Sequence, residues 1–216
     1  MTGDSTMHQT ATALMSMITF HGGKCADRIV YAQSHYLIFG GINYKVVDHI
    51  VNHKKQLPDI VIMTVGAHLQ DMGDLKMIWD SLLNDISYLR SNDTPWGYHN
   101  FTFIWKTQNP GHLNCTNIFE PFTKSNIRTR DPNDPSDIFH WNLHSEFDQY
   151  NIEMALKSGF KVIDMSPLYY RPDAHVALNL LFPNKKVAYD CLHYCNPGPL
   201  NLFVVLLYNM FLNNEL

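Results

Sequence analysis

Two short segments near opposite ends of the chain carry residue types that could perform acyl-transfer chemistry. The first is Gly3-Asp4-Ser5, and the second contains Asp190 and His193 in the spacing D-x-x-H. A serine hydroxyl becomes a good nucleophile when an imidazole accepts its proton, and a carboxylate can orient that imidazole and stabilise its charged form. If folding joins the segments, Ser5, His193 and Asp190 would form a Ser-His-Asp triad.

Each segment also has a simpler interpretation when it is taken alone. Asp4 or Ser5 could cap the N-terminus of a helix, and any turn can hold the aspartate and the histidine. In the catalytic interpretation Gly3 lets the chain turn sharply, and a helix over residues 6–19 points its N-terminal N–H groups at the active centre. The pairing of both segments in a chain of single-domain size favours catalysis.

Three further segments lie between these two: T-Q-N-P-G-H at 107–112, V-I-D-M-S at 162–166 and R-P-D-A-H at 171–175. The second segment itself extends beyond its triad residues and reads D-C-L-H-Y-C-N-P-G at 190–198. In this order, from residue 3 to about 208, they resemble the PC-esterase family, which includes the plant trichome-birefringence-like polysaccharide O-acetyltransferases. Arg171, Asp173 and His175 are expected to fasten the loop before the catalytic turn, and His175 could also touch substrate.

The resemblance implies a fold, an activity and a substrate class. The fold would be an α/β, flavodoxin-like SGNH-hydrolase three-layer sandwich with a central parallel sheet. The activity would be acyl transfer at carbohydrate O-acetyl groups through an acetyl-serine intermediate, in either an O-acetyltransferase or an acetylesterase. The partners would be a carbohydrate or glycan and an acetyl donor that acts as co-substrate, without a bound cofactor.

Similar hydrolases stabilise the oxyanion with donors from three places in such a fold. Here these would be the backbone N–H of Ser5, a glycine N–H at 40 or 41, for which we take Gly41, and the side chain of His68. His68 could instead simply pack beneath its loop. Trp96, Trp105, Trp141 and the tyrosines at 169–170 could stack on sugars, although aromatic residues are more often part of a core.

Two features depart from the family pattern. Plant members usually carry an arginine three residues after the serine, where this chain has His8. Ser5 also follows so soon after Met1 that we expect the first strand to be missing, as in an N-terminally truncated chain. Both features favour an alternative function, in which a catalytically impaired domain binds carbohydrate or another partner.

The chain has four cysteines, an even number that allows disulfides. Cys191 and Cys195 flank His193, and a disulfide from this region to Cys115 or Cys25 would fasten the catalytic loop to the rest of the domain. Reduced, buried cysteines are the alternative. The resemblance implies the oxidising secretory pathway, in the Golgi lumen or outside the cell. Three N-glycosylation sequons, at Asn92, Asn100 and Asn114, agree with that compartment.

Composition limits the remaining possibilities. The 216 residues are expected to form one domain, 1–216, and the 45% apolar and 17% charged fractions are typical of a globular protein. A net charge of −4 gives no reason to expect nucleic acid as a partner. No apolar run is long enough to span a membrane. We expect no metal site, although His140 and His144 have the spacing of a helical ligand pair.

Strand and helix patterns alternate along the chain, as in a parallel sheet covered on both faces. The expected helices are 6–19, 43–56, 73–91, 143–158 and 198–213. The expected strands are 28–31, 36–39, 59–65, 101–105 and 161–164. On such a sheet, the active centre lies at the carboxyl ends of the strands.

Overall fold

A computed structural model gives the structure of the protein, and its main element is a five-stranded sheet. The structure describes residues 1–24, 26–37, 45–52, 57–95, 97–123, 131, 133–176 and 190–216. All strand pairs of this sheet are parallel and the strand order is β2-β1-β3-β4-β5. The strands are β1 (Thr2–Gly3), β2 (Ala32–Gln33), β3 (Ile60–Met63), β4 (Thr102–Lys106) and β5 (Lys161–Ile163).

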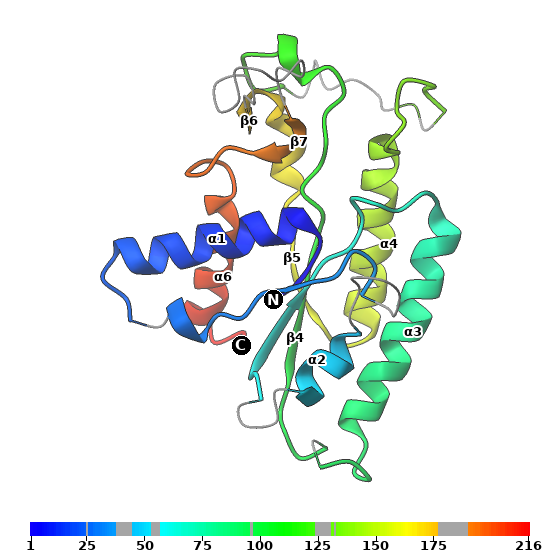
Figure 1. The fold of residues 1–216 in the computed structure, drawn as a ribbon, viewed down its shortest axis with the longest axis vertical. Helices are drawn as coiled ribbons and strands as arrows, with labels where there is room; N and C mark the ends of the chain where they lie inside the picture. Colours follow the sequence, from blue (N-terminus) through cyan, green and yellow to red (C-terminus); the bar gives the residue numbers. More distant parts are fainter. Residues whose placement is uncertain are drawn as a thin grey trace.

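Helices cover both faces of the sheet (Figure 1). On one face lie α1 (Ser5–Phe20) and α6 (Asn201–Leu212). On the other lie α2 (Val46–Asn52), α3 (Met72–Arg90) and α4 (His144–Lys157). The result is the three-layer α/β architecture with a central parallel sheet that the sequence predicted.

The two central strands show why the sheet needs a layer on each side. In β3, Val61 and Met63 belong to the core beneath α2, α3 and α4, whereas Ile62 belongs to the core beneath α1 and α6. In β4, Phe103 and Trp105 lie on the first side and Ile104 on the second. Because successive strand residues point to opposite faces, a continuous apolar run is stable only between two layers of helices.

A second, two-stranded sheet lies beside the main one. β6 (His175–Val176) pairs antiparallel with β7 (Asp190–Tyr194), with an irregular register. Short 3-10 helices connect the larger elements: Ala26–Arg28, Cys115–Asn117, Trp141–Leu143, Ser166–Tyr170 and Pro172–Ala174. The sequence predicted a turn at 190–193, but these residues form a strand, because β6 offers its backbone as a partner.

Several predicted boundaries differ from the structure. The expectation of a missing first strand was wrong, since Thr2 and Gly3 pair with both β2 and β3. The strand expected at 28–31 lies at Ala32–Gln33, after a 3-10 helix that ends at Arg28. Of the strand expected at 36–39, residues 36 and 37 are a bend and the rest lie outside the described residues. In the described part of the chain, no helix is long and apolar enough to cross a bilayer.

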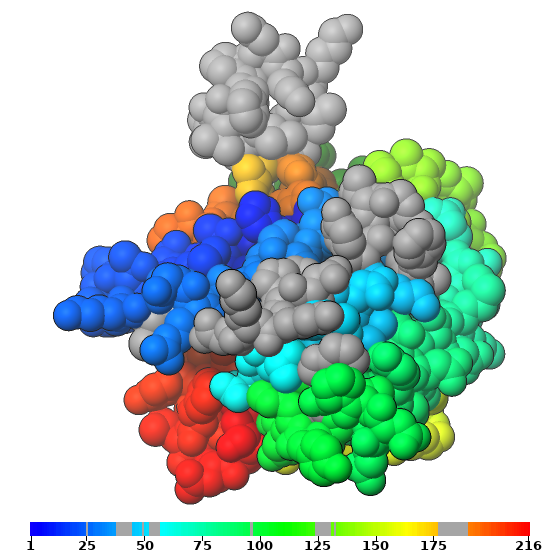
Figure 2. Space-filling view, turned by 60° about the horizontal axis from the view of Figure 1, so that its bottom comes forward, coloured from blue at the N-terminus to red at the C-terminus, as the bar shows by residue number. Residues whose placement is uncertain are grey.

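The N-terminal and C-terminal regions of the chain lie against each other. α1 packs on α6, and β7 runs past the beginning of α1 (Figure 1). In the space-filling view, the blue N-terminal residues adjoin orange residues, a colour that covers β7 and the residues that follow it (Figure 2). The fold therefore brings together the two sequence segments from which the triad was predicted.

Candidate active site

Ser5 is the first residue of α1 and directly follows the Asp4 N-cap. As the first helical residue, it has a backbone N–H without an acceptor inside the helix. Gly3 is needed here for close packing rather than for an unusual turn. A Cβ at residue 3 would lie 2.8 Å from both the Met7 Cβ and the Thr64 Cγ2. Gly3 thus lets β1 lie against β3 while α1 begins directly above it.

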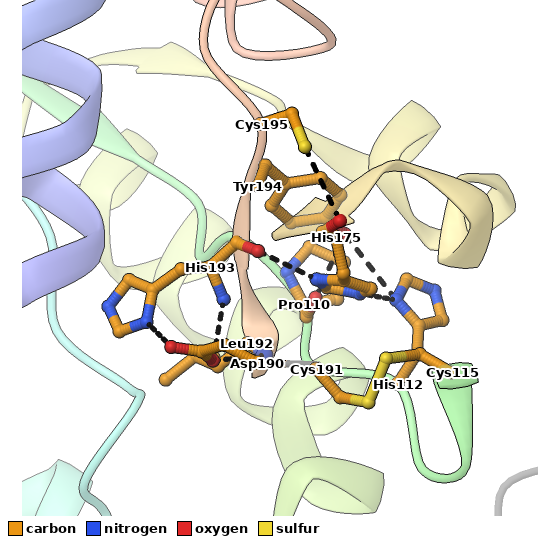
Figure 3. The surroundings of a disulfide bond; sticks show 10 residues. All are labelled: Pro110, His112, Cys115, His175, Asp190, Cys191, Leu192, His193, Tyr194 and Cys195. Atoms are coloured by element: carbon orange, nitrogen blue, oxygen red, sulfur yellow. Dashed lines mark hydrogen bonds and ion pairs between the residues drawn. A yellow bond between two sulfur atoms is a disulfide. The ribbon is translucent and has the colours of Figure 1, made fainter. Parts of the chain in front are cut away.

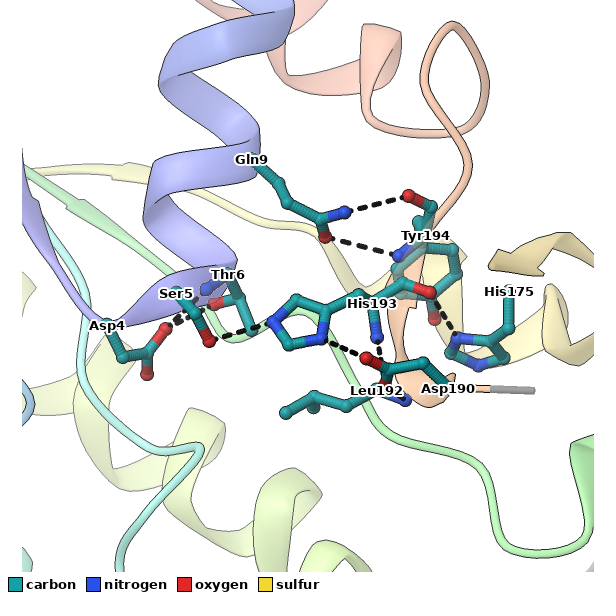
Figure 4. A network of polar contacts seen from close by, with 9 residues as sticks. All are labelled: Asp4, Ser5, Thr6, Gln9, His175, Asp190, Leu192, His193 and Tyr194. Carbon is teal, nitrogen blue, oxygen red and sulfur yellow. Dashed lines mark hydrogen bonds and ion pairs between the residues drawn. The ribbon is translucent and has the colours of Figure 1, made fainter. Parts of the chain in front are cut away.

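The three predicted triad residues lie in hydrogen-bonding order (Figure 4). The Ser5 Oγ lies 2.8 Å from the Nε2 of His193, across 188 residues of sequence. The Nδ1 of the same ring lies 2.7 Å from the Oδ2 of Asp190. A neutral imidazole with its proton on Nδ1 donates to the carboxylate and accepts from the hydroxyl.

The aspartate and the histidine are three residues apart in a strand, where regular geometry would point their side chains to opposite faces. The irregular register of β7 removes this obstacle. The Oδ1 of Asp190 accepts hydrogen bonds from the backbone N–H groups of Leu192 and His193, at 3.1 and 3.2 Å. One carboxylate therefore fixes both the backbone and the ring of His193.

These contacts keep Asp190 ionised. Partial burial raises the pKa of the carboxyl group, but the hydrogen bond and charge of His193 and the backbone N–H donors outweigh burial and lower the pKa to about 2. The carboxylate is thus available at neutral pH to stabilise an imidazolium.

A disulfide and two histidines hold β7 in place (Figure 3). Cys191 is bonded to Cys115 in the loop after β4. The backbone N–H of His112 donates to the carbonyl oxygen of Cys191 at 2.9 Å. The Nδ1 of His175 donates to the carbonyl oxygen of His193 at 3.1 Å, and its Nε2 lies 2.8 Å from the Nδ1 of His112.

The position of His175 favours the structural role over contact with substrate. Its side chain is 4% exposed, and both ring nitrogens have partners. Arg171 and Asp173 form a two-fold ion pair just before it, which fits the predicted fastening of this loop. Of the other cysteine candidates, Cys195 is free and exposed, and Cys25 lies outside the described residues.

A buried network of hydrogen bonds stabilises the beginning of α1. The fully buried carboxylate of Asp4 accepts hydrogen bonds from the backbone N–H and the hydroxyl of Thr6, at 2.9 and 2.6 Å. Gln108, in the predicted 107–112 segment, reaches both residues with its side-chain amide. Asp4, beside Ser5, is therefore a structural cap, whereas Asp190 contacts the imidazole of the candidate triad.

Of the three predicted oxyanion donors, Ser5 and His68 are among the described residues. The N–H of Ser5 lies at the helix N-terminus, and Gly41 lies outside the described residues. His68 stacks on His35 with ring centroids 4.3 Å apart. Burial lowers the pKa of His68, which favours the neutral ring. Its Nε2 is buried without a hydrogen-bond partner among the described residues.

The remaining predictions concern the tryptophans that could stack on sugars, His8 and a possible metal site. Trp105 and Trp141 are buried, which agrees with their alternative role as core residues, and Trp96 is not described. His8 is exposed and stacks on Tyr31, with ring centroids 4.9 Å apart. Within the described residues, no group of three or more His, Cys, Asp or Glu side chains could hold a metal ion.

Sequence reasoning missed two residues that shape this site. The hydroxyl of Tyr31 contacts the carbonyl oxygens of Gly3 and Asp4, at 3.1 and 2.9 Å. Gln9 binds the backbone of Tyr194. The helical spacing of Ser5 and Gln9 was visible in the sequence, but the partner of Gln9 is a backbone group, which leaves no mark in a sequence.

Comparison with known proteins places the chain in a family. The sequence model of PC-Esterase, the GDSL/SGNH-like acyl-esterase family found in Pmr5 and Cas1p, matches residues 7–210. The chain belongs to the PC-esterase family. No match was found among curated proteins.

The family match indicates acyl-esterase or acyltransferase chemistry for this chain. The matched range includes Asp190 and His193 and begins two residues after Ser5. The role of Ser5 as nucleophile therefore depends on the geometry described above and on the Gly-Asp-Ser resemblance.

Proposed function

We propose that this PC-esterase domain transfers acyl groups at carbohydrate O-acetyl positions through an acetyl-serine intermediate. The observation that carries the proposal is the continuous chain of contacts Ser5–His193–Asp190, at 2.8 and 2.7 Å. Such a chain is the arrangement that activates a serine hydroxyl.

In the first half of the reaction, the Ser5 Oγ attacks the acetyl carbonyl carbon while the Nε2 of His193 accepts the hydroxyl proton. The resulting tetrahedral intermediate collapses when the bond to the leaving group breaks, which belongs to an acetylated sugar in the esterase reaction or to the acetyl donor in the transferase reaction. The imidazolium returns its proton to the departing group, so that the products of this step are the deacetylated leaving group and acetyl-Ser5. Asp190 stabilises the imidazolium throughout and stays ionised.

In the second half, water or a second hydroxyl group attacks the acetyl-serine. His193 again accepts the proton and then returns it to the Ser5 Oγ, which restores the enzyme. Water as acceptor makes the protein an acetylesterase, and a sugar hydroxyl makes it an O-acetyltransferase.

The negative oxygen of each intermediate needs hydrogen-bond donors. The N–H of Ser5, at the positive end of the α1 dipole, suits this role. We assign His68 and the N–H of Gly41 as the further donors. Loss of one such donor typically raises the barrier by about 3–4 kcal/mol.

The carbohydrate substrate and the compartment come from the family resemblance. We propose a glycan and an acetyl donor as the two substrates, and the Golgi lumen or the extracellular space as the location. The disulfide agrees with an oxidising compartment. The asparagines of the three sequons, Asn92, Asn100 and Asn114, are all exposed, which agrees with glycosylation.

A fluorophosphonate probe and an acetyl-ester assay test the proposal. We expect the wild type to be labelled and to release acetate, and Ser5→Ala to do neither. Ser145→Ala is the matched control, because Ser145 is exposed on the first turn of α4. Labelling that survives Ser5→Ala would contradict the mechanism. A folded wild type without labelling or turnover would favour the non-catalytic binding domain.

A further inference from the structure

Gln9 connects the element that carries Ser5 to the element that carries His193. It lies on α1, four residues after Ser5, and its side-chain amide makes two hydrogen bonds with the backbone of Tyr194. The Nε2 donates to the Tyr194 carbonyl oxygen at 2.9 Å, and the Oε1 accepts from the Tyr194 N–H at 3.2 Å (Figure 4). Tyr194 directly follows His193 on β7.

The spacing on the helix makes both contacts possible at once. Residues four apart lie on the same face of a helix, about 6 Å apart along its axis. Ser5 and Gln9 therefore face β7 together. Ser5 meets the ring of His193, and Gln9 meets the backbone one residue further along.

The Gln9 side chain bonds to the edge of β7 at which a neighbouring strand would otherwise pair. Backbone groups of adjacent strand residues point to opposite edges of the strand. At one edge, the carbonyl oxygen of His193 accepts from His175, and the N–H of Cys195 donates to the Ala174 carbonyl oxygen at 2.9 Å. At the other edge, the Gln9 amide supplies the donor and the acceptor that Tyr194 needs.

Tyr194 is held in place by its own burial and hydrogen bonding. Its side chain is fully buried, and its hydroxyl contacts the carbonyl oxygen of Pro110 at 2.9 Å. β7 is also bound to the loop after β4 through the disulfide of Cys191. Because the buried Tyr194 side chain and the disulfide hold β7 in place, the hydrogen bonds of Gln9 to Tyr194 set the distance of α1 from β7.

We propose that Gln9 is a positioning residue that holds the Ser5 Oγ within proton-transfer distance of the His193 Nε2. The consequence for turnover rests on the triad mechanism proposed above. The geometric claim does not, because the contact between Ser5 and His193 can be measured without turnover. A misplacement of about 1 Å in an active site can cost about 100-fold in rate, so a contact that sets this distance affects catalysis strongly.

Two substitutions separate the hydrogen bonds of Gln9 from its volume. Gln9→Met keeps a similar size and removes both bonds. Gln9→Glu, when ionised, can accept from the Tyr194 N–H but places a negative charge against the Tyr194 carbonyl oxygen. When protonated, the same carboxyl group again supplies one donor and one acceptor. Thr12→Ala is the matched control, because among the described residues the Thr12 hydroxyl bonds within α1, to the His8 carbonyl oxygen at 2.9 Å.

The first experiment measures kcat and KM on an acetyl ester. We expect Gln9→Met to lower kcat by about 10- to 100-fold with KM nearly unchanged, and Thr12→Ala to keep wild-type values. The kcat of Gln9→Glu, divided by that of the wild type at the same pH, should rise as pH falls toward the ordinary glutamate pKa of about 4.3. Wild-type kcat in Gln9→Met, or a pH-independent ratio, would overturn the proposal.

The second experiment reads the contact directly by ¹⁵N NMR of the His193 ring. In the wild type the Nε2 accepts a hydrogen bond from Ser5, and in Ser5→Ala it cannot. We expect the Nε2 shift of Gln9→Met to move to the Ser5→Ala value, and that of Thr12→Ala to stay at the wild-type value. A wild-type shift in Gln9→Met would refute the positioning role, even if the wild type has no turnover. If Gln9→Met does not fold, the Nε2 shift of Gln9→Glu at neutral pH, where the new side chain is ionised, is compared with the wild-type and Ser5→Ala values at the same pH, and a wild-type shift there would refute the positioning role.

Discussion

Cys191 lies between Asp190 and His193 and is disulfide-bonded to Cys115, 76 residues earlier in the chain. The bond joins the strand that carries the acid and the base of the candidate triad to the loop after β4. Cys115 is buried, so this anchor lies inside the protein. The disulfide therefore links the stability of the protein to the position of two residues of the candidate triad.

Replacing both cysteines of the disulfide with serine should destabilise the protein and weaken Ser5 labelling. A cross-link that closes a loop of this length typically stabilises the folded state by about 2–5 kcal/mol. Urea unfolding of Cys115→Ser/Cys191→Ser and of the wild type measures this difference. Cys195→Ser is the control, since Cys195 is free and exposed. Equal unfolding midpoints for the double variant and the wild type would show that the bond adds no stability.

Gly3→Ala should destabilise the protein through crowding. The new methyl group would lie 2.8 Å from the Met7 Cβ and the Thr64 Cγ2, so β1, α1 or β3 must shift. Overpacking of this kind typically costs about 1–3 kcal/mol. Because Ser5 follows two residues later, fluorophosphonate labelling should also slow.

A second substitution checks this cause. Thr64→Ser deletes the crowding methyl group and keeps the hydroxyl that contacts Gln108 at 3.2 Å. Gly3→Ala/Thr64→Ser should therefore recover part of the stability lost in Gly3→Ala, as measured by thermal unfolding. Equal stability of Gly3→Ala and the double variant would show that crowding against the Thr64 methyl group is not the cause of the destabilisation.

The sequence predicted those elements whose patterns are local. The continuous apolar run of β3 and the helical spacing of α3 each match the structure within three residues at either end. The triad was predicted because the chemistry needs three residue types that stand in recognisable motifs. The placement of β2 and the strand character of β7 depend on partners distant in sequence, which a local pattern does not reveal.

The support of the site was harder to predict than the triad. His175 was predicted as a motif residue, but its hydrogen bond to the His193 carbonyl oxygen depends on the pairing of β6 with β7. The two hydrogen bonds of the Gln9 side chain to Tyr194 go to backbone groups, which every residue has. Sequence motifs thus identify the groups that react more readily than those that hold them.

Asp148→Asn should change how stability depends on pH. Burial of Asp148 raises the pKa of its carboxyl group to about 7, although hydrogen bonds from Gln108 and Tyr169 oppose the shift. The unfolded carboxyl group ionises near pH 3.9. Between about pH 4 and 7, the folded state therefore binds more protons than the unfolded state, and stability falls as pH rises.

Asparagine at this position cannot ionise, so the fall contributed by Asp148 should disappear. Urea unfolding at several pH values from about 4.5 to 7.5 measures the free energy of unfolding of both proteins. We expect a flatter profile for Asp148→Asn. Asp131→Asn, at an exposed residue, serves as the control. Parallel profiles for the wild type and Asp148→Asn would contradict the raised pKa.

Asp190→Asn should abolish most turnover while leaving Ser5 and His193 in place. The amide is similar in size to the carboxylate, and its oxygen can still accept from the backbone of β7. It cannot supply the negative charge that stabilises the imidazolium, and its NH₂ group favours the wrong tautomer of His193. Comparable substitutions in serine hydrolase triads lower kcat by about 10⁴-fold.

The assay is kcat on an acetyl ester, with Asp173→Asn as the control, because Asp173 pairs with Arg171 and does not contact His193. The control should lose far less activity than Asp190→Asn. Near-wild-type kcat in Asp190→Asn would mean that the 2.7 Å contact between Asp190 and His193 is structural. The imidazole would then have to be oriented by other groups, such as the backbone contact from His175.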